Sequence, residues 1–406
     1  LIHKIMNNRF FTLIAGTLIA ALSAFAQTAP VQIIHNATNA DSVDVYINSN
    51  LALPDFKYRT ATVFLDLPAG TALNVQIAPG NSNSAADAIY SKSLTLDQSK
   101  RYIVMAAGEV GGSTAFDLFI KDEARNAAGT SGNTDVVAFH GSTDAGSVGV
   151  YENSLGVVAD PFDFADFAGY VELPNDDYYL KVTANGGTPS LLGYDAPLKT
   201  LGLADAAITV VASGYLAPAA GQPAFGLFAV TAAGGEFLPL PTSMTRAQII
   251  HNSPSAAADS VDIYIDDALA LDDVMYRTAT AFIDLKANAE FEVKIAPGSS
   301  SSSADAIWNM KYTLDPTKAY MLMAAGEVGG AGATAFDVFV TDKAREMATT
   351  TGNTDVIAFH GSTDAGSVGV YENSLGVVAD PFDFADFAGY LELPNDDYYL
   401  KVTANG

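Results

Sequence analysis

The chain has 406 residues, of which 49% are hydrophobic and 16% charged, and its 46 acidic and 20 basic residues give a formal net charge of −26. This composition indicates roughly three or four folded domains of about a hundred residues each rather than a disordered chain. The charge excludes nucleic acid and anionic membrane surfaces as partners, because both repel a polyanion. The absence of cysteine excludes disulfides, thiolate metal sites and a cysteine nucleophile.

The N-terminal segment has the three parts of a secretory signal. Met6 to Arg9 is a short basic start, Phe10 to Leu22 is an apolar run, and Ala24-Phe25-Ala26 places small residues where signal peptidase reads them. The run is short for a helix that spans a bilayer, and no later stretch is long and apolar enough to span one. We therefore predict a signal peptide over residues 1–26 with its start at Met6, a mature N-terminus at Gln27, and no transmembrane segment after cleavage.

The rest of the chain repeats at two levels. Asp135–Gly186 and Asp355–Gly406 are identical except at Val137/Ile357 and Val171/Leu391. Each half divides again into smaller units that begin with a strand ending in histidine, and such self-similarity is the signature of a tandem array. The predicted repeats cover residues 31–123, 135–240, 246–343 and 355–406, with linkers at 122–134 and 239–245. We expect the fourth repeat to be truncated, because the second uses residues 191–230 to complete its strands.

Within a repeat the pattern is that of short strands. The first repeat has β-branched or alternating segments separated by Gly, Asn, Pro, Ser or Asp, and these predict strands at 31–36, 42–48, 58–67, 72–78, 88–95, 101–107 and 114–121. About seven strands in such a length favour an all-β fold of tandem immunoglobulin-like β-sandwiches. We expect these sandwiches to touch mainly at their ends, so that the stability of the array is close to the sum of its domains.

One phrase of the repeat is specific enough to suggest a family. In the first copy His35-Asn36-Ala37 precedes Ser42-Val43-Asp44-Val45-Tyr46, and an aromatic-rich strand, a Leu67-Pro68 turn and the strand Phe116 to Phe119 follow. This pattern resembles the bacterial "domain of unknown function" 4397 family over essentially the whole mature chain. The resemblance implies secreted or cell-surface proteins with tandem copies and implies no activity. The second and fourth copies depart from it, because glycine replaces the acidic residue of the Ser-Val-Asp-Val-Tyr phrase.

The repeated histidine is the first candidate site. It occurs once in each copy, as His35, His140, His251 and His360. A catalytic role would need a nucleophile and an orienting carboxylate, for which Ser42 with Asp41 or Asp44 could be written down without support from a sharp-turn motif. One histidine in each repeat is also few ligands for zinc. We therefore predict structural histidines that bond the backbone of the following loop.

An acidic loop and the aromatic residues within it form the second candidate. Its carboxylates are candidate calcium ligands and occur in two copies, as Asp160, Asp163, Asp166, Asp380, Asp383 and Asp386. The spacing is not that of an EF-hand, and a solvated edge that discourages strand pairing is the favoured interpretation. Alternation predicts that Phe162 and Phe164 lie on one face and pack in a core rather than form a sugar-binding platform. The stretch Gly108–Gly112 predicts a hairpin loop and no phosphate site, since neither a helix nor lysine follows it.

These observations predict an exported or cell-surface repeat protein with a structural or adhesive role, no catalysis and no cofactor. Surface glycans or other extracellular polymers are the partners that such a role suggests. The alternative is an extracellular carbohydrate- or calcium-binding module attached to a further C-terminal domain. No constellation of side chains in the sequence favours an enzyme over either of these roles.

Overall fold

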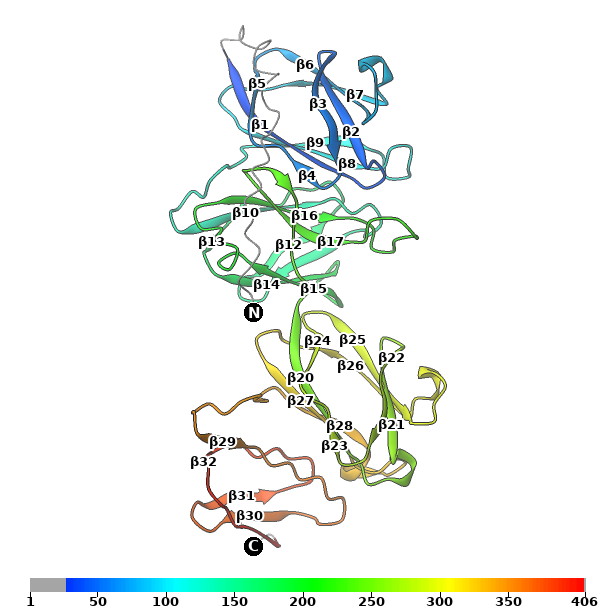
Figure 1. Ribbon diagram of the computed structural model, residues 1–406, viewed down its shortest axis with the longest axis vertical. Coiled ribbons are helices and arrows are strands. Elements are labelled where there is room, and N and C mark those ends of the chain that lie inside the picture. Colours follow the sequence, from blue (N-terminus) through cyan, green and yellow to red (C-terminus); the bar gives the residue numbers. More distant parts are fainter. Residues whose placement is uncertain (1–26, 405–406) are drawn as a thin grey trace. The chain divides into compact units, whose positions relative to one another are not determined.

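The computed structural model describes residues 27–404, and the predicted signal peptide lies outside these residues (Figure 1). The described chain is all-β, with four short 3-10 helices, which confirms the predicted fold class. It divides into two compact units, which are described separately below. Unit 1 contains residues 27–149, 157–178 and 196–240, and unit 2 contains residues 150–156, 179–195 and the chain from Pro241 onward. No helix among the described residues is long and apolar enough to cross a membrane.

The strands follow the repeats. The first repeat contains β1 (Thr28–Ala37), β2 (Ser42–Ile47), β3 (Asn50–Lys57), β4 (Thr60–Ala61), β5 (Leu65–Pro68), β6 (Ala72–Pro79), η1 (Ala85–Asp87), β7 (Tyr90–Thr95), β8 (Tyr102–Gly108) and β9 (Asp117–Asp122). The second contains β10 (Asn133–His140), β11 (Val148–Glu152), β12 (Gly156–Phe162), β13 (Val171–Pro174), β14 (Asp177–Ala184), β15 (Ser190–Pro197), β16 (Ala207–Ser213), β17 (Gly226–Thr231), β18 (Gly235–Glu236) and β19 (Leu238–Pro239).

The other two repeats continue the pattern. The third contains β20 (Met244–Asn252), η2 (Ala256–Ala258), β21 (Ser260–Ile265), β22 (Ala268–Met275), β23 (Thr278–Ala279), β24 (Ile283–Lys286), β25 (Glu290–Pro297), η3 (Ser303–Asp305), β26 (Trp308–Thr313), β27 (Ala319–Ala325), η4 (Gly332–Thr334) and β28 (Asp337–Thr341). The fourth contains β29 (Asn353–Val356), β30 (Val368–Glu372), β31 (Gly376–Phe382), β32 (Leu391–Pro394) and β33 (Leu400–Ala404).

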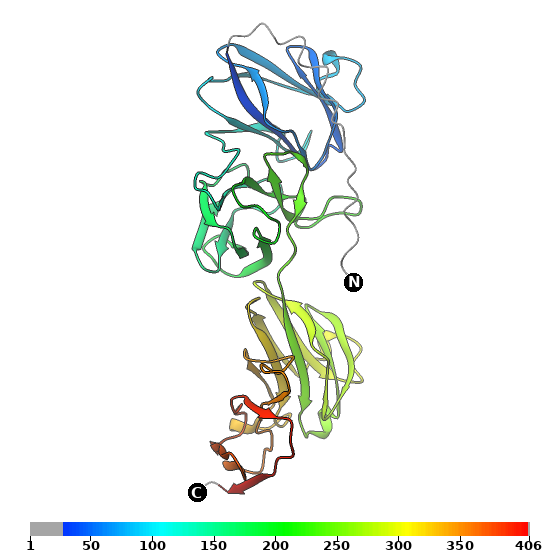
Figure 2. The ribbon, with the colours of Figure 1, turned by 60° about the vertical axis from the view of Figure 1, so that its left-hand side comes forward.

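The first repeat is a sandwich of two sheets, seen as two layers in Figure 2. One sheet has the order β3-β2-β6-β7 and the other β4-β1-β8-β9, with β5 also pairing with β1. Alternating residues of the two sheets, among them Val45, Leu73 and Val104, fill a core between the layers. Strands β1 and β8 run parallel, whereas the other pairs in this repeat are antiparallel. The third repeat has the same arrangement in β22-β21-β25-β26 and β23-β20-β27-β28.

In the first repeat, for which strands were predicted, the main difference lies between residues 50 and 68. The predicted strand at 58–67 is two short strands, β4 and β5, and the sequence before it forms the unpredicted strand β3. Strand β3 contains Pro54 and Asp55, which are typical of turns. It pairs with β2 through register shifts, and Asp55 has a φ of 48°. Strand β3 was not predicted because its residues are those of a loop, and its irregular pairing with β2 is what accommodates them at the sheet edge.

The outer face of the β4-β1-β8-β9 sheet is also buried. Ile34 and Met105, both 0% exposed, belong to a second apolar cluster in unit 1. This cluster, hereafter the inter-repeat core, contains Ile34, Ala61, Ile103, Met105, Ala107, Ala124, Val137, Phe139, Val211, Val230 and Phe237. Its members come from both the first and the second repeat. The expectation that consecutive repeats touch mainly at their ends is therefore wrong within unit 1, because sheet faces pack against each other.

Polar contacts reinforce this junction. Strand β18 of the second repeat adds to β4 of the first, with Gly235 opposite Ala61. The predicted linker at 122–134 is anchored as well. In it, the Arg125 guanidinium lies 2.6 Å from Asp135 of β10 and 2.6 Å from Glu172 of β13. The segment between the first two repeats is thus part of the folded structure rather than a free connection.

The fourth repeat forms fewer strand pairs than the second. Its described strands make a two-stranded sheet, β29-β32, and a three-stranded sheet, β31-β30-β33. Strand β10 continues to His140 and pairs in parallel with β16 from Asp135 to His140. Its counterpart in the fourth repeat, β29, already ends at Val356. The two segments are almost identical in sequence, so the difference comes from the neighbouring strand and not from the residues themselves.

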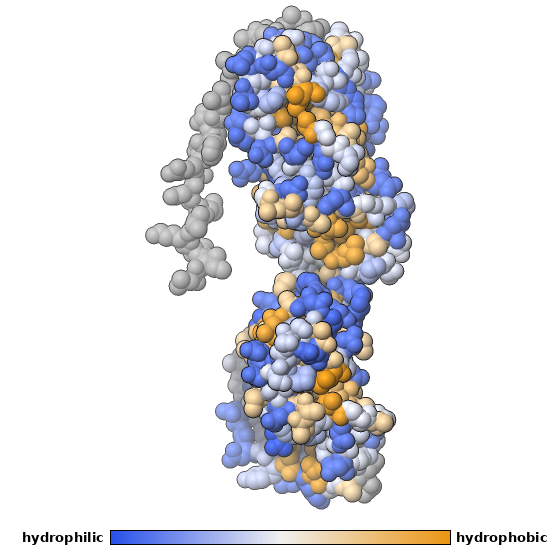
Figure 3. All heavy atoms as spheres, turned by 90° about the vertical axis from the view of Figure 1, so that its right-hand side faces the viewer, coloured by the Kyte–Doolittle hydropathy of each residue, from blue (hydrophilic) through white to orange (hydrophobic). Residues whose placement is uncertain are grey.

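The visible surface of both units mixes polar and apolar residues (Figure 3). Among the exposed apolar side chains, Leu51 is 45% and Val157 is 61% exposed, and both lie on edge strands. Single exposed apolar residues of this kind are normal for a folded protein.

Candidate functional site

The four histidines occupy the same corner of each repeat. His35 and His251 lie within the last three residues of β1 and β20, His140 ends β10, and His360 follows β29. The four residues are between 0% and 6% exposed. In three copies the Nε2 atom lies within hydrogen-bond distance of a backbone carbonyl of the following loop: His140 and Gly146 at 2.9 Å, His251 and Ala258 at 2.6 Å, and His360 and Gly366 at 2.8 Å. In the first copy, His35 Nδ1 accepts a hydrogen bond from the Ala37 N–H at 3.3 Å. The rings are thus placed to hold the strand-to-loop corner.

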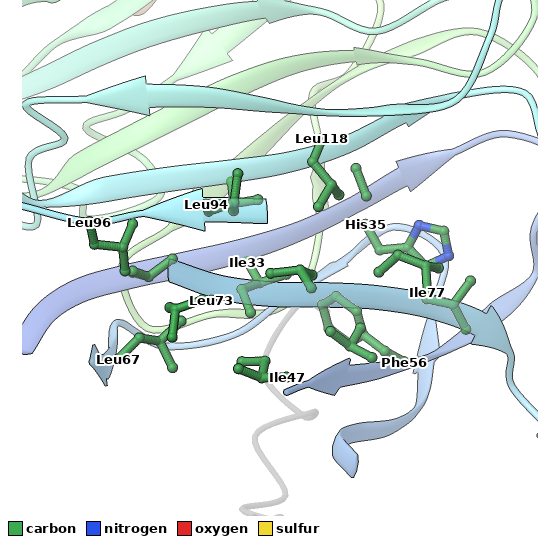
Figure 4. Close-up of a pocket in the computed structure, with 16 residues that line it drawn as sticks. Ile33, His35, Ile47, Phe56, Leu67, Leu73, Ile77, Leu94, Leu96 and Leu118 are labelled. Atoms are coloured by element: carbon green, nitrogen blue, oxygen red, sulfur yellow. The ribbon is translucent and has the colours of Figure 1, made fainter. Parts of the chain in front are cut away.

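The surroundings of His35 are apolar. It lies at one end of a row of side chains that surrounds a small cavity of about 30 Å³ inside the first repeat, with Leu67 and Leu96 toward the other end (Figure 4). Phe56 is its nearest ring neighbour, with ring centroids 5.9 Å apart. Burial lowers the pKa of His35 to about 4. The pKa values of His140 and His251 are also lowered, and burial is the main cause in both.

The low pKa of His35 predicts a pH dependence of stability. The pKa is about 4 in the folded chain and 6.5 as an ordinary value, so the unfolded chain binds the proton more readily. The contribution to stability is therefore fully present above about pH 6.5 and is lost as the pH falls toward about 4, with a size of about 3 kcal/mol. We expect urea unfolding of the first repeat to show this loss, and His35→Gln to have a flatter pH profile over the same window. Parallel profiles for the two proteins would contradict the prediction.

The carboxylate that the sequence places near His35 has other partners. Asp44 is 4% exposed and accepts hydrogen bonds from the Asp55 N–H at 2.7 Å and the Ser82 N–H at 3.1 Å. These contacts hold the irregular strand β3 and the loop after β6 against β2. In the third repeat Asp262 accepts in the same way from the Asp273 N–H at 3.0 Å. The acid of the Ser-Val-Asp-Val-Tyr phrase is thus placed to organise a β-bulge rather than to orient a histidine.

The acidic loop is a tight turn. Asp166 accepts a hydrogen bond from the Asp163 N–H at 3.2 Å, and Asp386 accepts one from the Asp383 N–H at 2.9 Å. All four side chains are exposed. Asp380 accepts a hydrogen bond from the Tyr371 hydroxyl, and Asp160 precedes the turn on β12. In the part of the chain that the structure describes, no group of three or more His, Cys, Asp or Glu side chains is placed to hold a metal ion.

The aromatic residues of this loop point to two different clusters. Phe162 is 4% exposed, and its ring lies 5.7 Å from that of His140. Phe164 instead lies 5.8 Å from Phe119, at the inter-repeat core. The expectation that both face one side is wrong, because β12 ends at Phe162 and the chain turns through Ala165, whose φ is 72°. The alternation of a strand does not continue through such a turn.

The glycine-rich stretch is a hairpin loop, as expected. Glu109 and Thr114 are joined by a backbone hydrogen bond of 2.8 Å. The Asn39 amide bonds both the N–H and the carbonyl of Val110 at 2.9 Å. The loop therefore supports the motif loop that follows His35. Its backbone groups are engaged within the repeat and do not point to a bound phosphate.

One feature missed by the sequence analysis is a polar cleft in unit 2, with a volume of about 580 Å³. The two motif loops that follow His251 and His360 meet there. Its lining consists of Asn252, Pro254, Ser255, Tyr276, Arg277, Glu327, Val328, Gly361, Ser362, Thr363 and Asp364. Glu327 accepts a hydrogen bond of 2.8 Å from Thr363, which joins the third repeat to the fourth. The only sequence signal for this cleft is that the two histidine motifs, at His251 and His360, recur at a fixed separation along the chain.

Comparison with known proteins gives a family but no activity. A family model described as "Domain of unknown function (DUF4397)" matches residues 29–151 and 245–371. No curated protein matches the chain. Among solved structures, the Bacillus anthracis TIE protein aligns at 9% identity over 73% of this chain and 50% of its own, with a TM-score of 0.17. The chain thus spans about half the length of that protein.

Two streptococcal structures also align. One, described as alpha-glucan binding by a streptococcal virulence factor, has 9% identity over 52% of this chain and 97% of its own, with a TM-score of 0.15. The other, from family 41 carbohydrate-binding modules of streptococcal virulence factors, has 11% identity over 48% and 94%, with a TM-score of 0.15. At such scores the alignments carry no argument about the ligand or role of this chain.

Proposed function

The chain belongs to the DUF4397 family, and from this premise we propose that it is an exported structural and adhesive repeat protein without catalytic activity. Its working element is a pair of repeats joined through an apolar core. Each of the two family matches begins in one repeat and ends in the next, at Tyr151 and Tyr371. The matched unit therefore spans a junction between repeats rather than a single sandwich.

The observation that carries the proposal is the inter-repeat core. Phe139 is 0% exposed and lies 4.6 Å from the Phe167 ring and 6.1 Å from the Phe119 ring of the first repeat. The same contacts recur in unit 2, where the Phe359 ring lies 4.8 Å from Phe387 and 6.0 Å from Phe339. Burial of whole sheet faces resists separation of the repeats much better than flexible linkers would. Such a junction suits a protein that transmits force or sets a spacing.

Two further features support this role. The side chains that could carry chemistry, the four histidines and Asp44, are buried and bonded to the backbone of their own repeats. The N-terminal segment of the sequence has the pattern of an export signal. A structural role needs neither an exposed nucleophile nor a cofactor.

Stretching the full chain in a single-molecule experiment tests the proposal. If the first two repeats form one mechanical element, they should unfold in a single step, releasing about 210 residues and roughly 70 nm of chain at about 3.5 Å per residue. Two separate steps of about half that length would show independent repeats and contradict the proposal. Stretching in the presence of calcium or of a glycan mixture is the control, because a large rise in the unfolding force would favour the binding-module alternative.

A further inference from the structure

We propose that unit 1 binds a compact, doubly charged oxyanion, such as sulfate or a phosphate group, between Arg101 and Lys121. The two side chains belong to the first repeat and lie at the rim of the inter-repeat core, where Phe64 and Tyr170 are partly buried. The inference goes beyond the structural role proposed above, because it assigns a ligand chemistry to a defined place in the fold.

Arg101 and Lys121 project from the same face of one sheet. Lys121 of β9 lies opposite Ile103 of β8, and Ile103 belongs to the inter-repeat core. Residues opposite each other on neighbouring strands share a face, and so do residues two apart on one strand, such as Arg101 and Ile103. The two cationic residues are therefore diagonal neighbours, about 7–8 Å apart at the backbone. Their long side chains can reach one anion from two sides.

Two aromatic rings at the rim hold the cations in place. The Arg101 guanidinium lies 5.6 Å from the centroid of the Phe64 ring, and the Lys121 ammonium lies 6.0 Å from the centroid of the Tyr170 ring. Contacts of this kind attract a cation to the face of a ring without using its N–H groups as hydrogen-bond donors. The donors of both side chains thus stay available for an acceptor.

Neither cation is neutralised within the described chain. The Arg101 Nε atom is buried and has no hydrogen-bond partner there, and Lys121 forms no ion pair. The adjacent acids Asp122 and Glu123 do not pair with them, and Asp122 pairs with Lys100 instead. A buried donor without an acceptor is costly, and like charges on neighbouring strands repel each other. An anion between the two side chains removes both costs.

Unit 2 contains the same aromatic frame without the two cations. The positions of Arg101 and Lys121 are occupied there by Ala319 and Thr341. Tyr390 nevertheless keeps its contact with an arginine, 4.7 Å from the ring centroid, and an apolar cluster joins the repeats of this unit as well. Packing of two repeats therefore does not require the cation pair, which is a property of unit 1.

The charges of the pair define the class of ligand. A guanidinium and an ammonium group together present several N–H donors and two positive charges, which suit the oxygens of a tetrahedral anion. A doubly charged oxyanion neutralises both side chains, whereas a carboxylate neutralises one. The formal charge of −26 on the chain disfavours a polyanion. A free sulfate or phosphate ion and a terminal phosphate ester share the required chemistry.

Calorimetric titration of the full chain with sodium sulfate or sodium phosphate tests the proposal. We expect one site per chain, and no comparable binding of sodium chloride at the same ionic strength, which controls for screening. Arg101→Ala and Lys121→Thr introduce the residues of unit 2 and should each weaken binding by about tenfold or more. Lys311→Ala is the matched control, because Lys311 is an exposed cation that pairs with Glu290. Sulfate binding that Arg101→Ala leaves unchanged would overturn the assignment.

A gain of binding in unit 2 provides an independent arm. Ala319→Arg combined with Thr341→Lys places the same pair of cations on the corresponding aromatic frame, so the number of sulfate sites should rise from one to two. A folded double variant that still binds one sulfate would show that these two side chains are not sufficient and would contradict the proposal.

Glycerol phosphate and glycerol distinguish the two sources of the anion. Tighter binding of glycerol phosphate than of phosphate would support an ester as the ligand, and equal binding would support the free ion; both results keep the oxyanion site. Equal binding of glycerol and glycerol phosphate would mean that charge is not recognised, and the site would have to be abandoned.

Discussion

Replacing Phe139 with alanine should destabilise the first two repeats together, by about 3–5 kcal/mol. The ring is 0% exposed and belongs to the inter-repeat core, where Phe119 of one repeat and Phe167 of the next contact it. Its loss removes apolar surface from both repeats and leaves a cavity that neither sheet can fill alone. We expect urea titrations followed by hydrogen exchange to show earlier loss of protection in β8 of the first repeat and in β16 of the second, at the same urea concentration.

The equivalent residue of unit 2 provides a matched control. Phe359 has nearly the same sequence context but is only half-buried, so Phe359→Ala should cost clearly less than Phe139→Ala. The cost of a large-to-small change depends on how much burial is lost and how far the site can collapse. If Phe139→Ala lowered protection in the second repeat and left β8 unchanged, the two repeats would not share a core.

The sequence contains a signal for the shared core that a search for alternation does not detect. Tyr102–Gly108 reads as a continuous run of apolar and small residues, whereas Leu73 to Ile77 alternates with polar residues. An alternating strand buries one face, and a continuous apolar strand is buried on both. β8 packs Val104 into its own sandwich and Met105 into the inter-repeat core. The fold class was predictable from strand patterns, but the partner of the second face was not, because it lies in a different repeat.

The candidate site was also predictable only in part, because contacts within one repeat can be inferred from the sequence and contacts between repeats cannot. The position of a histidine in each repeat follows from the repeated phrase, and its neighbour in the loop is only a few residues away, as for His140 and Gly146. Local contacts of this kind can be inferred from sequence. The polar cleft joins Arg277 to Asp364, and no local pattern indicates which surfaces of two repeats meet. Phe164 illustrates the limit as well, since one turn at Ala165 redirects it to another cluster.

Arg125→Ala should also have a large effect, of about 3 kcal/mol, although the arginine lies near the surface. Its partner Asp135 has a side chain that is 0% exposed, and that carboxylate otherwise accepts from the Gly129 N–H at 2.8 Å. Removing the arginine leaves a buried charge with too few hydrogen bonds, which costs far more than the loss of an exposed pair. The Ala124 side chain next to it is buried in the inter-repeat core, so the segment between the repeats should loosen at the same time.

Arg246 separates this effect from the loss of a surface charge, because it also binds two carboxylates. Its partners Asp284 and Glu346 are 61% and 38% exposed, so water replaces the arginine when it is removed. We expect Arg246→Ala to cost below about 1 kcal/mol, and Arg125→Ala to lower the urea midpoint several times further. A double variant, Arg125→Ala with Asp135→Leu, should recover much of the loss, because an apolar side chain needs no partner at that buried position. Equal costs for the two arginines would mean that solvent reaches Asp135 and that the junction between the repeats opens readily.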